Sequence, residues 1–167
     1  MLRIEIVKRA DGVGLLRCTR EDGSIAWQKQ SQATHFAFHD LTHYAVERAL
    51  GYRRGFFGLI AEGWEFEDTT GKGSRGALPT EALEVERIVG LFDAERNSGE
   101  LWSREEFNRF APRELTEADI QDVRRLRAEL FAQWSAIAPG EKLELTFEFV
   151  EASHAGTSAL PPERFQG

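Results

Sequence analysis

The stretch KLELTFEFVE, residues 142–151, alternates polar and apolar side chains without a break from Lys142 to Phe149. A period of two places alternate side chains on opposite faces of an extended chain, which is typical of a strand buried on one face. The apolar face carries Leu143, Leu145, Phe147 and Phe149. We therefore expect a strand over residues 143–149 with a helix layer against its apolar side.

The N-terminal 30 residues show the same period in shorter pieces. Leu2, Ile4 and Ile6 alternate with charged residues, and LLRCT and SIAWQKQ follow, the latter with Ile25 and Trp27 on one face. An Asp-Gly pair, a strong turn signal, precedes each of these two segments. Three antiparallel strands are expected here, with the C-terminal strand returning beside the first.

The middle of the chain is helical in pattern. A helix is expected from Pro79 or Thr80 to the Asn-Ser-Gly at 97–99, and capping boxes at Ser103 and Thr116 open two more. Strands at both ends with helices between them predict an α+β fold, an antiparallel sheet with helices packed on one face.

Length and composition fit one globular domain. The chain has 167 residues, 41% of them hydrophobic, and a net charge of −7. We expect a single domain over residues 1–151 and a flexible tail over 152–167, which is small, polar and proline-bearing. The oligomeric state cannot be deduced from these features.

The same features exclude several classes of partner and compartment. No extended basic cluster is present to neutralise phosphates, so we do not expect nucleic acid as a partner. We expect no membrane partner either, because neither a signal peptide nor a membrane span is visible, and this favours a cytoplasmic protein. Cys18 is the one cysteine, which rules out an intrachain disulfide.

Histidines gather in FAFHDLTHYAVE, residues 36–47. His39, His43 and Glu47 are four residues apart, a spacing that places side chains on one face of a helix. Two imidazoles at this spacing can bind one metal ion, with zinc the first candidate. Asp40 is expected as the N-cap of this helix.

The third ligand is left open. Glu47 is one candidate, Glu62 and Glu65 are others if their segment folds back on the helix, and His35 could approach from upstream. Glu47 or Glu62 would also serve as the general base. The alternative is a buried helix whose histidines are structural, with hydrogen bonds in place of a metal.

HDLTH, residues 39–43, resembles the HDxxH motif of the zinc-type proteins of ubiquinone biosynthesis. That resemblance implies a metal cluster at His39, Asp40 and His43. In that largely helical family a glutamate follows after eleven further residues, where this chain has Gly55. The wider pattern HDLxHYxxE is similar to a family of uncharacterised bacterial proteins, which implies no activity.

Arg53 and Arg54 directly follow the histidine segment and could bind a substrate carboxylate or phosphate. The alternative is a solvated pair at a helix C-terminus, where cations are stabilising. Together these features predict a metal-dependent hydrolase or lyase acting on a small molecule. The competing hypothesis is a non-catalytic binding or interaction domain, with the apolar segment GFFGLIAEGW, residues 55–64, as a partner surface.

Overall fold

A four-stranded antiparallel sheet forms one layer of the molecule in a computed structural model that describes residues 1–30 and 33–148. The strand order is β3-β2-β1-β4, so the C-terminal strand lies beside the first, as expected. Ile4 stands opposite Cys18 of one neighbour and Leu145 of the other. The strands are β1 (Leu2–Lys8), β2 (Gly14–Thr19), β3 (Ile25–Gln30) and β4 (Lys142–Phe147).

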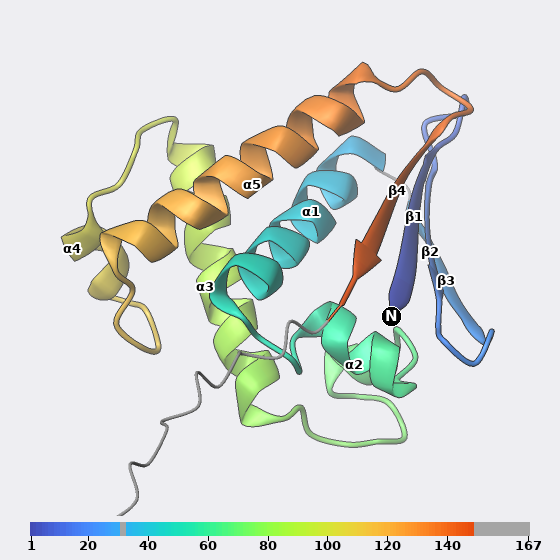
Figure 1. Ribbon diagram of the computed structural model, residues 1–167, viewed down its shortest axis with the longest axis horizontal. Helices are drawn as coiled ribbons and strands as arrows, with labels where there is room; N and C mark the ends of the chain where they lie inside the picture. The colour runs from blue at the N-terminus through green and yellow to red at the C-terminus, as the bar shows by residue number, and fades with distance from the viewer. Residues whose placement is uncertain (31–32, 149–167) are drawn as a thin grey trace, which may run out of the picture.

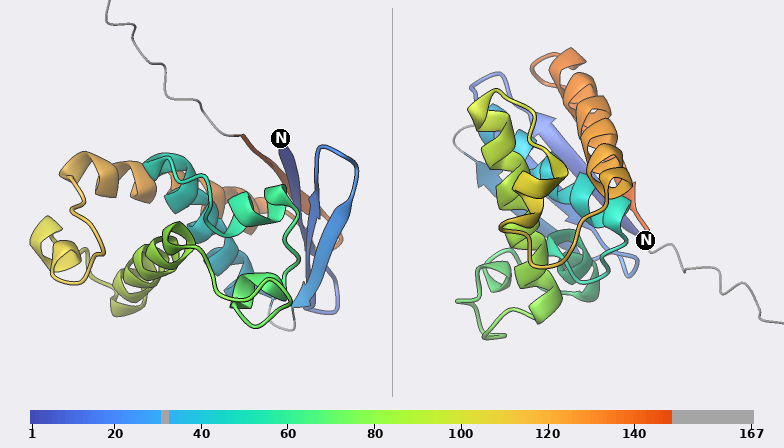
Figure 2. Two further views of the ribbon diagram at one scale, coloured as in Figure 1. Left: turned by 90° about the horizontal axis from the view of Figure 1, so that it is seen from below. Right: turned by 90° about the vertical axis from the view of Figure 1, so that its left-hand side faces the viewer.

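The helices form the second layer and lie on one side of the sheet (Figures 1 and 2). The helices are α1 (Ala33–Leu50), α2 (Phe56–Glu62), α3 (Thr80–Ser98), α4 (Arg104–Asn108) and α5 (Glu117–Ala136), with a 3-10 turn, η1, at Asp68–Thr70. The central helix α1 packs against α5, α3 and the sheet. The α+β prediction is therefore confirmed. The expected tail, residues 152–167, lies outside the described residues.

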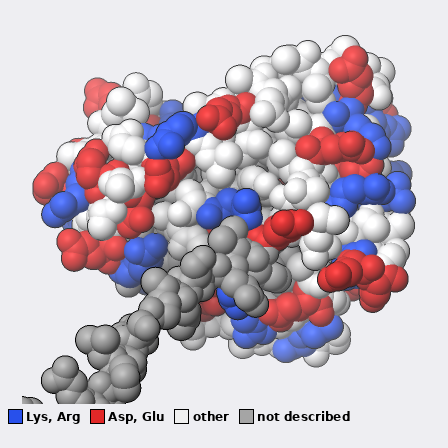
Figure 3. All heavy atoms as spheres, in the orientation of Figure 1, with Lys and Arg blue, Asp and Glu red and all other residues white. Residues whose placement is uncertain are grey.

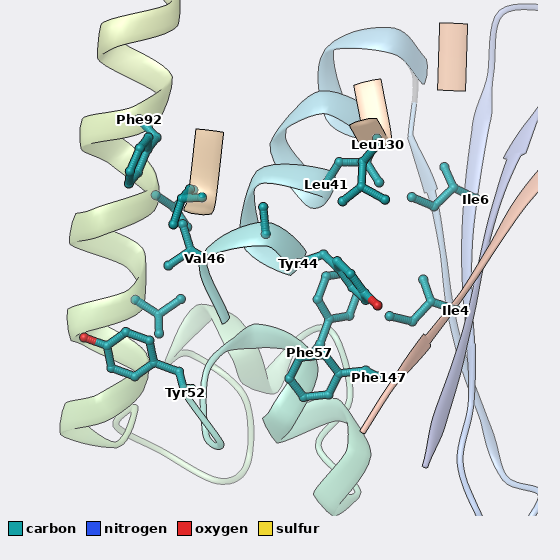
Figure 4. Packing of buried hydrophobic residues seen from close by; sticks show 14 of the residues in the cluster. Ile4, Ile6, Leu41, Tyr44, Val46, Tyr52, Phe57, Phe92, Leu130 and Phe147 are labelled. Atoms are coloured by element: carbon teal, nitrogen blue, oxygen red, sulfur yellow. The ribbon is translucent and has the colours of Figure 1, made fainter. Parts of the chain in front are cut away.

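The core forms where the apolar face of the sheet meets α1. Ile4 and Ile6 point from β1 toward Leu41 and Tyr44 of α1 (Figure 4), and the two isoleucines are 0% and 1% exposed. Phe147 of β4 is 2% exposed and packs edge-on against Tyr44. Full burial of one such side chain stabilises the fold by about 1.5–3 kcal/mol. In β1 and β4 the period of two therefore marks the buried face of the strand.

The opposite face of the sheet meets solvent. Ile25 and Trp27 share this face, as expected from their spacing, and are 42% and 58% exposed. Glu5 lies on the same face of β1 but is buried, because it pairs with Lys142 of β4 and lies 3.8 Å from Arg17 of β2. The Lys142 bond lowers the pKa of the Glu5 carboxyl below its usual value, against the opposing effect of burial.

Helix α1 begins at Ala33, so the prediction that it starts at Asp40 is wrong. Ala37, Leu41 and Ala45 follow one another at four-residue intervals and are all fully buried. This stripe continues the helix about two turns upstream of Asp40. Asp40 instead lies inside α1, 4% exposed, and accepts a hydrogen bond from Gln30 Nε2 at 2.9 Å. Burial raises the pKa of this carboxyl to about 6.

The later helices begin where their caps predict. Ser103 and Thr116 each form a capping box, with Glu106 and Asp119 as the respective partners. The segment GFFGLIAEGW forms α2 and contributes Phe57, buried in the core, so it is not the exposed partner surface that was considered above.

None of the described helices has the length and apolar character needed to cross a membrane. On the face seen in Figure 3, acidic and basic side chains are interspersed.

Candidate metal centre

Two packed helices, α1 and α3, bring three candidate metal ligands together. His39 and His43 lie one turn apart on α1, and Glu86 comes from α3. Each offers one ligand atom, and these atoms all lie within 4.8 Å of one another. This group can hold a metal ion. The structure thus groups His39 and His43 with one glutamate, which is Glu86.

The geometry between His43 and Glu86 is close to that of a coordinated pair. His43 Nε2 lies 3.4 Å from Glu86 Oε1. Ligand atoms about 2.0–2.1 Å from a tetrahedral zinc ion stand about 3.3 Å apart, so this pair needs little movement to share an ion. Burial raises the pKa of the Glu86 carboxyl, but the bond and charge of His43 outweigh it and leave the pKa lowered.

His39 is oriented by a carboxylate. Its Nδ1 lies 2.8 Å from Asp93 Oδ2 on α3, which leaves Nε2 as the ring nitrogen available to a metal. Metal-binding histidines commonly donate their second ring N–H to a carboxylate, which fixes the ring and raises its basicity. Asp93 is therefore a positioning residue for His39. The His39 side chain is 39% exposed, so this part of the group meets solvent.

His43 is enclosed and lies between two carboxylates. Its side chain is 2% exposed, with Glu86 at Nε2 and Glu47 Oε2 at 3.6 Å from Nδ1. That second distance is too long for a good hydrogen bond but close for an ion pair. Burial lowers the pKa of this imidazole, yet the two carboxylates outweigh it and raise the pKa to about 10. The surroundings of His43 therefore stabilise a positive charge, whether proton or metal ion.

Glu47 has a different place from the one expected. Its Oε1 accepts hydrogen bonds from the backbone amides of Phe57 and Gly58, at 3.0 and 3.2 Å, and so caps the start of α2. Its Oε2 faces the Nδ1 side of His43. Glu47 thus contacts His43 on the side away from Glu86, and the group that could hold a metal contains Glu86 in place of Glu47. Burial raises the pKa of Glu47, opposed by His43 and the two amides.

The other expected site residues are engaged outside this group. Arg54 and Glu62 form a two-bond ion pair, with Nε–Oε1 at 2.9 Å and a second contact at 3.1 Å. The backbone amides of Arg53 and Arg54 both donate to Glu81 Oε1. The structure therefore does not bring Glu62 to the histidines as ligand or base. It gives Arg54 a structural partner in place of a substrate anion.

Three other residues also lie outside this group. Glu65 pairs with Arg20 at 3.2 Å, and His35 is exposed one turn before His39. Cys18 is fully buried, and this burial raises the pKa of its thiol. None of the three belongs to the ligand group found among the described residues.

No motif in the sequence points to Glu86 and Asp93. Both lie in a helix with several other acidic residues, and neither forms a motif with the histidines along the chain. The one available signal is their spacing of seven residues, which places both on one face of α3. Only the packing of α3 against α1 distinguishes them from their acidic neighbours.

Comparison of the chain with protein-family models, with curated proteins and with solved structures gave no match in any of the three. The function is therefore argued from the geometry of His39, His43 and Glu86.

Proposed function

We propose that this protein binds a divalent transition-metal ion through His39, His43 and Glu86 and uses it to catalyse hydrolysis or elimination on a small molecule. The observation that carries the proposal is the convergence of these three ligand atoms within 4.8 Å. Three protein ligands leave further coordination positions for water or substrate, which distinguishes a catalytic site from a closed structural one. Zinc is the first candidate, and iron(II) also accepts two histidines and one carboxylate.

The second coordination shell supports the proposal. Each histidine has a carboxylate at Nδ1, Asp93 for His39 at 2.8 Å and Glu47 for His43 at 3.6 Å. The Asp93 bond would fix the His39 ring with Nε2 toward the metal and make it a stronger ligand, while Glu47 places a negative charge beside His43. A bound ion of this kind lowers the pKa of a coordinated water to about 7 and supplies hydroxide at neutral pH. Because His39 and Glu86 are partly exposed, a small molecule can reach the ion.

A second candidate function has its own support. A protonated His43 also forms an ion cluster with buried Glu47 and partly exposed Glu86, and its raised pKa of about 10 favours that charged form. In that case the histidines stabilise the fold, and the protein is a non-catalytic binding domain.

Metal analysis separates the two candidates. Full-length protein made without a histidine tag is stripped with chelator, dialysed and titrated with zinc, manganese, iron(II) and cobalt(II), with bound metal measured by elemental analysis. The first proposal expects one ion per chain and its loss in His39→Ala and Glu86→Gln. The matched controls are His35→Ala, one turn upstream on α1, and Glu129→Gln, exposed on α5, and both should bind as the wild type does. Failure of the unchanged protein to bind any of the four metals would leave the binding domain.

A further inference from the structure

Gly90 occupies the face of α3 that carries the metal centre. It lies four residues after Glu86 and three before Asp93, which are the spacings of neighbours on one helix face. Both neighbours contact histidines of α1, Glu86 through His43 Nε2 at 3.4 Å and Asp93 through His39 Nδ1 at 2.8 Å. Gly90 is therefore the position on α3 between the two acids that contact the histidines.

Nothing within the described protein requires glycine at this position. Glycine is among the least favourable residues in a helix interior, and Gly90 lies in the middle of α3 with helical backbone angles. Beyond the adjoining residues and the backbone of α3 itself, a Cβ built on Gly90 would meet no atom within 4 Å, whereas at Gly55 and Gly58 it would lie 2.5 Å from Glu47 and 1.8 Å from the Arg53 carbonyl. Those two glycines are explained by close packing, and Gly90 is not.

The metal centre is open on the side where Gly90 lies. His43 is 2% exposed, whereas the side chains of His39 and Glu86 are 39% and 44% exposed. Gly90 itself is exposed. A molecule that coordinates an ion at this centre must approach past the exposed ligands, and the helix surface between Glu86 and Asp93 then carries no side chain to obstruct it.

We propose that Gly90 keeps this surface bare to seat the organic part of a small molecule whose oxygen coordinates the metal. The inference rests on the proposed function and deepens it, because it assigns the substrate to oxygen-donor molecules too large to share the site with a side chain at position 90. Gly90 is then a specificity-determining residue. A ligand of only a few atoms needs no such space and is indifferent to this residue.

Two probes of different size test this inference in cobalt(II)-loaded, full-length protein, where ligand binding changes the visible absorption of the metal. Benzohydroxamate supplies two oxygen donors and a bulky ring, and azide is small. Replacement Gly90→Leu should weaken benzohydroxamate by about tenfold or more, because a new side chain then fills the ligand's space. Azide affinity should change by less than about threefold, since azide needs no such space. The control Ala128→Leu adds the same bulk at an exposed position of α5 and should change neither.

The outcomes distinguish the inference from the proposed function. Failure of the wild type to bind cobalt(II) removes the proposed function, and with it this inference. Cobalt(II) binding with equal benzohydroxamate affinity in wild type and Gly90→Leu overturns the inference alone and leaves the metal site. Equal losses for both probes also overturn it, because they would mean that the new side chain disturbs the metal. Gly90→Ala provides a second variant with minimal effect on folding, and its loss of benzohydroxamate affinity should lie between those of wild type and Gly90→Leu.

Discussion

Glu47 joins His43 to the start of α2 through the two oxygens of one carboxylate. Oε2 lies 3.6 Å from His43 Nδ1, and Oε1 accepts the amides of Phe57 and Gly58. The backbone at Gly55 packs closely against the Glu47 side chain. Only glycine fits there, because a Cβ would lie 2.5 Å from the Glu47 carboxyl carbon. A change at the proposed metal centre and a change at the start of α2 would therefore act on the same carboxylate.

Replacement Glu47→Gln tests this connection. The amide oxygen can still accept from Phe57 and Gly58, but the negative charge beside His43 is lost. We expect metal affinity to fall by about 10–100-fold, the usual cost of losing such a second-shell partner. The apoprotein should lose about 1–3 kcal/mol of unfolding free energy at neutral pH, because the buried His43 cation loses one counterion. Titration calorimetry and urea unfolding measure the two effects, and Glu129→Gln on α5 should show neither.

The fold was predictable because its signals are local. Alternation marked the buried faces of β1 and β4, and Ser103 and Thr116 marked two helix starts through side-chain to backbone bonds within three residues. The start of α1 was missed because Asp40 has the chemistry of a cap but is held inside the fold by Gln30 of β3. That contact is a tertiary one, and tertiary contacts override local preference.

The candidate site was predictable only in part for the same reason. His39 and His43 share a helix, so their spacing revealed them. Glu86 and Asp93 reach them across the packing of α3 on α1, which no spacing along the chain records. Glu47 has the spacing of a third ligand on the helix face of His39 and His43, but its carboxylate accepts a hydrogen bond from the backbone amide of Phe57 in α2. A search for side-chain motifs cannot detect a backbone partner of this kind.

Replacement Phe147→Ala tests the sheet-to-helix core. Phe147 is 2% exposed, stands opposite Leu2 and packs against Tyr44 and Phe57. The cavity left by its ring should lower the free energy of unfolding by about 3–5 kcal/mol. The neighbouring exposed residue serves as control, since Thr146→Ala should cost less than about 1 kcal/mol. A cost below that for Phe147 itself would contradict its place in the core.

The Glu5–Lys142 pair gives the protein an acid-sensitive contribution to stability. The pKa of Glu5 is lowered in the folded state, chiefly by the Lys142 bond. The folded state therefore binds its proton less readily than the unfolded state, and this stabilisation is present above the unfolded pKa and lost as pH falls through the folded one. Replacement Glu5→Gln should reduce the fall in stability between pH 6 and pH 3, at roughly the pH range where carboxylates titrate. Urea unfolding at both pH values, with Glu129→Gln as control, measures the difference.

Gly90 also carries a prediction about stability. Because a Cβ at this position meets no atom within 4 Å beyond the adjoining residues and the backbone of α3, Gly90→Ala should stabilise the apoprotein by about 0.5–1 kcal/mol through helix propensity alone. Thermal and urea unfolding of metal-free protein measure this gain. A loss of stability would show that the position has packing partners, and the argument for a bare binding surface would then fail.

Replacement His43→Asn separates the metal centre from the buried ion cluster most directly. Asparagine is polar but shorter, and it cannot carry the positive charge that Glu47 and Glu86 surround. In the metal reading, wild-type protein loses thermal stability when chelator is added, and the variant binds no metal and is indifferent to chelator.

In the structural reading, wild type is itself indifferent to chelator. The variant then loses about 1–3 kcal/mol, because the buried carboxylate of Glu47 is left without its cation. Thermal unfolding of both proteins, with and without chelator, gives four curves that discriminate between the two hypotheses. The control His35→Asn, at an exposed position of α1, should superimpose on wild type under both. A wild type that chelator does not affect, together with a destabilised His43→Asn, would remove the enzyme proposal and leave a fold stabilised by a buried imidazolium.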